Sequence, residues 1–184
     1  MDSGENPTRL ASDLIFASRV FSVCRERYRL GEREVVRDVV HHPGAVVMVP
    51  LLGDGRVVMV RQWRAPAGRK LLELPAGTLE PGEEPAAAAE RELQEEIGYR
   101  AGRLTALGSF YSAPGFCTER LHLFLAEDLV PDPRPGDEDE AIEVVTLPLG
   151  EALEQALRGE LQDAKTIAGL CLAAARLGLW GAGR

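Results

Sequence analysis

The segment ERELQEEIGY, residues 90–99, restricts the fold more than any other stretch of this 184-residue chain. It places four glutamates within seven residues and then reaches a glycine. Pro85 suits the first turn of a helix and Gly98 its C-terminal end, so we expect a helix over about residues 84–97. Acids at helical spacing repel each other by roughly a few tenths of a kcal/mol per pair. The segment therefore predicts a helix in which some other interaction must offset the repulsion between the glutamates.

Two of these glutamates are expected beside the buried face of the helix. The apolar stripe consists of Ala86, Ala89, Leu93 and Ile97. At about 100° per residue, Glu96 lies about 60° and Glu92 about 100° from Leu93. Two carboxylates at a half-buried edge are unfavourable unless a cation joins them. The pattern favours a cation site on the side shared by Glu92 and Glu96.

A solvated acidic face is the alternative interpretation. Arg91 can pair with Glu95 one turn later, and acids near a helix start favour the helix dipole. Glu96, however, lies in the last turn, where the dipole disfavours an acid. An acidic helix that docks on a partner protein is a further alternative, and divalent metal would not stabilise it.

The spacing of charged residues before and within the helix resembles the Nudix box. Gly77 is followed after five residues by Glu83, and Arg91-Glu92-Leu93 follows after seven more. Glu95-Glu96 and Gly98-Tyr99 complete the pattern. So many charged positions at fixed spacing make a chance match very improbable. The resemblance implies a loop–helix–loop that binds Mg²⁺ or Mn²⁺ and hydrolyses nucleoside diphosphates linked to another moiety.

The resemblance also implies a role for each box residue. The expected metal ligands are the main-chain carbonyl of Ala76 and the carboxylates of Glu92, Glu95 and Glu96. The expected structural residues are Gly77, Glu83, Arg91 and Gly98. Among these, Glu83 and Arg91 are expected to form an ion pair that ties the loop to the helix. Carboxylate and carbonyl oxygens suit Mg²⁺ or Mn²⁺ rather than zinc.

The rest of the chain predicts an α+β protein, and the resemblance makes it a Nudix fold, with a mixed β-sheet sandwiched between α-helices (α/β/α). Apolar and β-branched runs predict strands at 13–23, 33–40, 71–75, 103–112, 120–129 and 141–148. A β-hairpin is expected around Gly53-Asp54-Gly55, and two helices at 149–159 and 163–180. We divide the chain into N-terminal strands (1–43), expected to serve dimerisation, and a Nudix hydrolase domain (44–184).

The composition of the chain limits the kinds of molecule that it can bind and the compartment in which it works. The net charge of −8 argues against binding to nucleic acid or to an anionic membrane, because both need clustered Lys and Arg. Three cysteines without paired spacing argue against a disulfide scaffold and favour a reducing cytoplasm. The polar N-terminus does not resemble a signal peptide, and the longest apolar stretch is interrupted by Arg176.

Residues outside the box are similar to the ADP-ribose pyrophosphatase subgroup, and the resemblance covers about residues 35–160. The substrate-binding residues that it implies are Arg61, Arg64, Pro114, Gly115 and Phe116. The implied reaction is Mg²⁺-dependent hydrolysis of ADP-ribose to AMP and ribose 5-phosphate. NADH, an ADP-sugar or a dinucleoside polyphosphate stays open as the substrate, as does a non-catalytic module that binds ADP-ribose.

The attacking water also needs a general base. Carboxylates that ligate metal are poor bases, so another carboxylate is expected. The acidic run 137–140 is the only dense one outside the box and its flanks, and the subgroup resemblance places a catalytic glutamate in it. Glu140 is favoured over Glu138 because it abuts the next strand, and Glu95 is the remaining candidate.

The segment before the Nudix domain is longer than a minimal domain of this kind needs. Members of the resembled subgroup are homodimers that exchange N-terminal strands. We therefore expect a homodimer in which residues 14–40 form the interface.

Overall fold

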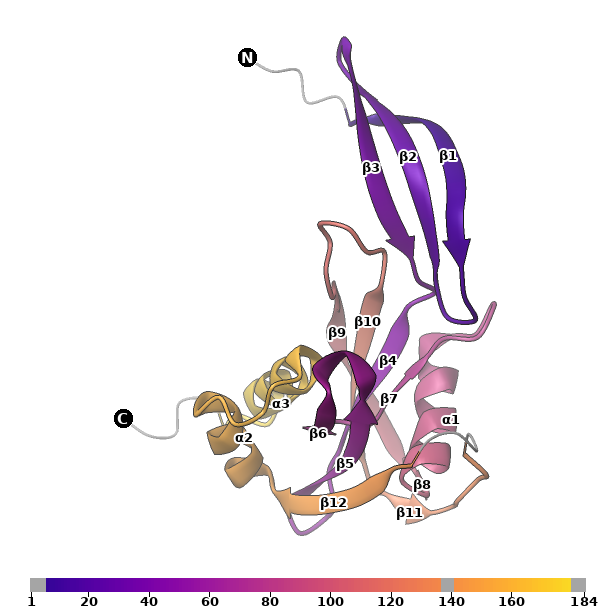
Figure 1. Ribbon diagram of the computed structural model, residues 1–184. Helices are drawn as coiled ribbons and strands as arrows, with labels where there is room; N and C mark the ends of the chain where they lie inside the picture. The colour runs from indigo at the N-terminus through magenta and orange to yellow at the C-terminus, as the bar shows by residue number, and fades with distance from the viewer. Residues whose placement is uncertain (1–5, 137–140, 180–184) are drawn as a thin grey trace. The chain divides into compact units, whose positions relative to one another are not determined.

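The computed structural model describes residues 6–136 and 141–179, and these fall into two compact units. The N-terminal unit consists of residues 1–44 and 111–120, and the main unit consists of residues 45–110 and 121–184. Figure 1 labels the helices and strands of both.

The N-terminal unit is built on a three-stranded antiparallel sheet. Its strands are β1 (Thr8–Ala17), β2 (Ser22–Leu30) and β3 (Arg33–His41), in the order β1-β2-β3. A two-residue turn joins β2 to β3, and Gly31 adopts the positive φ of 59° that such a turn requires. The carboxylate of Glu26 is buried between the strands and is bound by Arg9 from β1 and His41 from β3. Charged hydrogen bonds from both neighbours therefore hold β2 in the middle of the sheet.

The main unit contains two larger sheets and a short pair. The first has the order β7-β4-β10-β9, formed by Ala76–Thr78, Ala45–Pro50, Arg120–Glu127 and Arg103–Tyr111. It is mixed, because β4 runs parallel to β10 and antiparallel to β7. The second is antiparallel with the order β12-β5-β6, formed by Glu143–Pro148, Arg56–Arg64 and Arg69–Glu73. The short strands β8 (Tyr99–Arg100) and β11 (Val130–Pro131) pair with each other.

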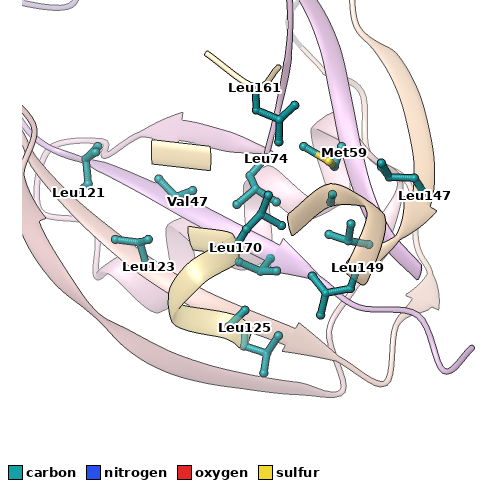
Figure 2. Packing of buried hydrophobic residues seen from close by; sticks show 14 of the residues in the cluster. Val47, Met59, Leu74, Leu121, Leu123, Leu125, Leu147, Leu149, Leu161 and Leu170 are labelled. Carbon is teal, nitrogen blue, oxygen red and sulfur yellow. The ribbon is translucent and has the colours of Figure 1, made fainter. Parts of the chain in front are cut away.

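Helices cover both faces of these strands. The helices are α1 (Pro85–Glu96), α2 (Leu149–Leu157) and α3 (Ala164–Arg176), with a short 3-10 turn at Ala65–Ala67. Val46 and Met48 of β4 share a cluster with Leu93 of α1, whereas Val47 and Val49 share the opposite cluster with α3. Figure 2 shows the second cluster, in which Val47 and Leu123 lie beside Leu170 of α3. The predicted α+β sandwich, with helices on both sides of the strands, is confirmed.

The predicted hairpin at residues 53–55 is wrong in its pairing. A tight turn forms there, and Gly55 N–H donates to the Leu52 carbonyl at 2.9 Å. The flanking strands then diverge, because β4 joins the first sheet and β5 the second, linked only by an isolated bridge between Leu51 and Val57. Both strands are apolar runs that are buried on both faces, and such a pattern identifies a strand without identifying its partner.

The helix prediction at 84–97 agrees with α1 to within one residue at each end, but its apolar stripe differs at one position. Ala86 is exposed, and Ala88 is buried together with Ala89 and Leu93. The contact with β4 therefore begins later along α1 than expected. None of the helices in the described ranges 6–136 and 141–179 is both long and apolar enough to cross a membrane.

Candidate active site

The Arg91 guanidinium joins the loop before α1 to the helix. Its Nε and Nη2 atoms donate to the two carboxylate oxygens of Glu83 at 3.0 and 2.9 Å. Nη2 also donates to the Thr78 carbonyl at 3.2 Å, and Glu80 N–H donates to Glu83 at 3.0 Å. The hydrogen bond from Arg91 lowers the pKa of Glu83 below its usual value. Because the Arg91 and Glu83 side chains are only 20% and 15% exposed, this pair is shielded from solvent.

We expect Glu83→Gln to lower the free energy of unfolding by about 1–3 kcal/mol, because the amide cannot accept both hydrogen bonds from Arg91. For a chain of this size, that corresponds to roughly 2–4 °C in the unfolding midpoint per kcal/mol. Circular dichroism during a thermal scan measures the shift. Glu84→Gln, at an exposed neighbour, is the control. Equal midpoints for the two variants would contradict a stabilising role for the pair.

Glu92 and Glu96 lie against the backbone of β7. A Cβ atom at Gly77 would be 1.8 Å from Cδ of Glu92 and 1.9 Å from its Oε1, so any other residue here would displace that carboxylate from this position. One turn further along α1, the Glu96 carboxylate accepts a hydrogen bond from Ala76 N–H at 3.0 Å. The structure therefore brings Ala76, Gly77, Glu92 and Glu96 together at the half-buried shoulder of α1.

The third box carboxylate, Glu95, is also near this shoulder. Arg91 Nη1 forms ion pairs with Glu92 at 2.6 Å and with Glu95 at 3.1 Å. The Glu95 side chain is more exposed than that of Glu92, at 27% against 12%. At the end of the helix, Gly98 has a φ of 74°, which favours glycine and lets the chain turn away from α1.

The two arginines predicted to bind substrate lie in different surroundings on β5. Arg64 donates from Nε and Nη2 to the buried carboxylate of Glu73 at 2.8 and 2.7 Å. The hydrogen bond to Glu73 is the main reason that the pKa of Arg64 is raised, and the negative charge of Glu96 contributes in the same direction. Arg61 instead pairs with Glu143 of β12 at 3.0 Å, where both side chains are exposed. Arg64 is therefore bound by a buried carboxylate and is also under the influence of a box carboxylate.

The predicted substrate loop belongs to the N-terminal unit. Phe116 donates its N–H to the Ala113 carbonyl at 3.1 Å, which closes a turn around Pro114 and Gly115. The Phe116 carbonyl accepts a hydrogen bond from Val40 N–H at 2.8 Å, so the turn is attached to β3. Phe116 is 58% exposed.

The two candidates for the general base, Glu138 and Glu140, lie outside the described residues. The chain just before them follows the end of α1. Arg134 N–H donates to the Gln94 carbonyl at 3.1 Å, and Gln94 Nε2 donates to Asp132 at 2.7 Å. A Cβ atom at Gly136 would lie 3.1 Å from the Glu95 carbonyl oxygen. This approach brings the chain to the end of α1 immediately before the acidic run.

The family model for the NUDIX domain matches residues 40–170, which include the whole of this loop and helix. The chain belongs to the Nudix family. It is 43% identical to the ADP-ribose pyrophosphatase of Bacillus subtilis (strain 168) over 90% of this chain and 91% of that protein. It is 36% identical to the methanol dehydrogenase activator of Bacillus methanolicus, over 86% and 87% of the two chains. The crystal structure of an ADP compounds hydrolase superposes with a TM-score of 0.85 at 27% identity, covering 98% of this chain and 99% of that one.

Nudix hydrolases generally need a divalent metal, and the donor set at the shoulder of α1 fits one. Within residues 6–136 and 141–179, no three His, Cys, Asp or Glu side chains are already arranged around a common metal position. The carboxylate oxygens of Glu92, Glu95 and Glu96 are nevertheless of the hard type that such a metal prefers, and all three belong to one helix. Gly77 leaves the space into which Glu92 extends. The guanidinium of Arg91 already pairs with Glu92 and Glu95, so these carboxylates attract positive charge.

We expect Gly77→Ala to raise the Mg²⁺ concentration for half-maximal activity by about 10–100-fold, the range seen when a metal ligand loses its support. The added methyl group would displace the Glu92 carboxylate. Calorimetric titration with Mn²⁺ should show the same loss in affinity. Gly150→Ala is the control, because a Cβ atom there meets nothing within 4 Å. Unchanged metal affinity in Gly77→Ala would separate Glu92 from the metal site.

Sequence reasoning missed Glu73 and Lys165, which lie beside Arg64. Glu73 is completely buried, and Lys165 Nζ contacts its Oε2 at 2.5 Å from the start of α3. A charged residue inside the short apolar run Leu71–Leu74 was the available signal for Glu73. Lys165 gave no local signal, because its partner is 92 positions away in the chain.

Proposed function

We propose that this Nudix hydrolase cleaves the diphosphate of ADP-ribose with one water molecule, giving AMP and ribose 5-phosphate. The observation that carries the proposal is the 43% identity, over nine-tenths of both chains, to a protein named ADP-ribose pyrophosphatase. The close structural likeness to an ADP compounds hydrolase supports a substrate that contains ADP. The complete box supports a hydrolase rather than a non-catalytic module that binds ADP-ribose.

In this proposal, the working ion is Mg²⁺, for which Mn²⁺ can substitute. The ligands would be the carboxylates of Glu92, Glu95 and Glu96 and the carbonyl of Ala76. When bound, a divalent ion neutralises diphosphate charge and lowers the pKa of a bound water. The hydrogen bond from Ala76 N–H already orients Glu96, so β7 aligns this carboxylate before any ion arrives.

The remaining groups of the site would bind substrate and move the proton. Arg64, held by Glu73 and close to Glu96, suits the diphosphate. Arg61 would bind substrate from the same strand, and Pro114, Gly115 and Phe116 would flank the adenine. Glu140 is our preferred general base, with Glu138 second and Glu95 third. This preference rests on the sequence, in which Glu140 is the acid of the run that stands nearest to the start of β12 at Glu143.

A substrate panel at one fixed Mg²⁺ concentration tests the proposed reaction. We expect kcat/KM for ADP-ribose to exceed that for NADH, an ADP-sugar and a dinucleoside polyphosphate by about tenfold or more. Chromatography should identify AMP and ribose 5-phosphate, and EDTA should abolish their formation. A different best substrate would correct the specificity. Calorimetric binding of ADP-ribose without hydrolysis of any compound would favour the non-catalytic module.

We also propose that the chain forms a homodimer through exchanged N-terminal strands. Leu14, Ile15 and Phe16 of β1 are each more than half exposed within the N-terminal unit. Consecutive large apolar side chains on one strand are unusual at a surface that stays in water. A second copy of this unit would cover them.

Light scattering at micromolar concentration should give twice the mass of the chain, and Leu14→Glu should give a monomer with reduced activity. The Leu14 side chain is 64% exposed, so the charge should weaken association without unfolding the sheet. Leu157→Glu is the matched control, because Leu157 is 75% exposed and lies on α2, outside residues 14–40, so the dimer should persist. A fully active wild-type monomer would exclude the dimer.

A further inference from the structure

Glu73 is a buried carboxylate with two cationic partners, at the place where β5, β6 and α3 meet. Arg64 of β5 binds both of its oxygens, at 2.8 and 2.7 Å. Lys165 of α3 binds Oε2 at 2.5 Å. Burial opposes ionisation of Glu73, but the hydrogen bonds from Arg64 and the charge of Lys165 keep its pKa below the usual value. The group therefore stays charged inside the protein and binds both cations.

Lys165 is itself fixed by the start of α3. Its ammonium group pairs with Asp163 at 2.9 Å, and Asp163 caps the helix by accepting from Thr166 N–H at 3.0 Å. The Thr166 hydroxyl in turn accepts a hydrogen bond from Leu74 N–H at 2.8 Å, next to Glu73 in the chain. The helix start and the end of β6 therefore form one hydrogen-bonded assembly around Glu73.

This assembly orients the Arg64 guanidinium. The Nε and Nη2 atoms of Arg64 donate hydrogen bonds to Glu73. Its third nitrogen, Nη1, has no hydrogen-bond partner among the residues of the described ranges. The Arg64 side chain is 37% exposed, and the charge of Glu96 acts on it. A guanidinium held by one edge presents its other donors in a fixed direction, which suits the planar recognition of phosphate oxygens.

We propose that Glu73 and Lys165 are positioning residues that aim the unoccupied Nη1 side of Arg64 at the diphosphate of the substrate, beside the box carboxylates. This inference rests on the proposed function, because Arg64 is assigned there to the diphosphate. It adds two residues that contact no substrate and act through Arg64. The last helix, which the box does not include, thereby contributes to substrate binding.

A purely structural ion pair is the competing explanation. Buried ion pairs often contribute little net stability, because desolvation offsets their attraction, so stability alone is a weak reason for three charges here. The choice of cation also favours a specific role. The chain contains 21 Lys and Arg residues, of which only Lys70 and Lys165 are lysine. A compact ammonium at position 165 reaches Oε2 while leaving both oxygens accessible to the Arg64 fork.

A double-mutant cycle on KM separates the two explanations. We expect Lys165→Met to raise KM for ADP-ribose by about tenfold with a small change in kcat, and Arg64→Ala to raise KM further. In the Arg64→Ala background, Lys165→Met should have no additional effect on KM, because Lys165 acts only through Arg64. Lys165→Arg should restore part of the loss. Lys70→Met removes the other lysine, which is exposed on β6, and should leave KM unchanged.

The same cycle on binding gives a readout that does not depend on turnover. Calorimetry of ADP-ribose binding to the metal-free protein should reproduce the non-additive pattern in Kd. Equal effects of Lys165→Met in both backgrounds would overturn the inference, as would a lowered unfolding temperature with unchanged KM and Kd. Where Lys165→Met does not fold, Glu73→Gln takes its place in the cycle, because it keeps the shape and loses the double acceptor.

Failure of the proposed function would be visible earlier, in the wild-type protein. A wild type that neither hydrolyses nor binds ADP-ribose rejects that substrate while leaving the positioning role to be measured. The cycle is then run with the most active compound of the panel, since all of them share the diphosphate that Arg64 would contact. Additivity with that compound would reject the positioning role by itself.

Discussion

Replacing Glu96 or Glu92 with glutamine should lower kcat by about 10³-fold or more, while the protein remains folded. Glutamine keeps the shape of the side chain but removes a charged metal ligand. A 10³-fold loss corresponds to about 4 kcal/mol of transition-state stabilisation. A metal ion supplies several kcal/mol of such stabilisation, so a loss of this size is expected. Turnover at saturating Mg²⁺ and circular dichroism measure the two effects. Half-burial of both carboxylates beside β7 motivates the expectation.

Glu90→Gln is the matched control for these variants. At about 100° per residue, Glu90 lies about 60° from Leu93 on the opposite side from Glu96. Its carboxylate accepts a hydrogen bond from Ala101 N–H at 3.3 Å, and an amide oxygen can accept the same bond. This variant should keep normal turnover. Near-normal turnover in Glu92→Gln or Glu96→Gln would instead show that the ligand assignment is wrong.

The side of α1 that carries Glu92 and Glu96 could be predicted from the sequence, because the geometry of a helix fixes the relation between residues four apart. The surface that meets this side could not. The close approach of Gly77 to Glu92 depends on the pairing of β7 with β4, which places Val46 opposite Gly77. The Nudix resemblance predicted that Gly77 belongs to the site. The physical reason for a glycine there, which is the space taken by Glu92, became visible only in the structure.

Contacts between residues distant in the sequence explain the other features that could not be predicted. The apolar runs of β4 and β5 predicted strands correctly, yet their patterns contain no information on which sheet each joins. Glu26 stands among arginines and a tyrosine in a run that looks solvated, but Arg9 and His41 from neighbouring strands enclose it. Lys165 meets Glu73 across 92 positions of sequence. In each case, the decisive contact joins residues that are far apart in the sequence, and the spacing of residues within one helix or strand cannot reveal it.

Replacing Glu140 with glutamine should lower kcat by about 10²–10⁴-fold, the usual contribution of a general base, with little change in KM or metal affinity. Glu140 is outside the described residues, so the expectation rests on its neighbours. The preceding chain is bound to the end of α1 through Arg134 and Asp132, and β12 begins at Glu143. The acidic run thus lies in the sequence between a segment bound to α1 and the start of β12.

The comparison with Glu138→Gln decides which acid accepts the proton. Both variants remove one charge from the same acidic run, so general electrostatic effects on Mg²⁺ or substrate should be equal, and a difference in kcat reports the proton transfer alone. We expect the larger loss for Glu140→Gln, because that residue is nearer in the sequence to β12, which should fix it better in position than Glu138. A kcat within a few-fold of wild type for Glu140→Gln, together with a collapse for Glu138→Gln, would move the role to Glu138. If neither value fell, the base would have to belong to the box, and Glu95 would be the residue to replace next, because it is more exposed than Glu92 and pairs with Arg91 at 3.1 Å rather than 2.6 Å.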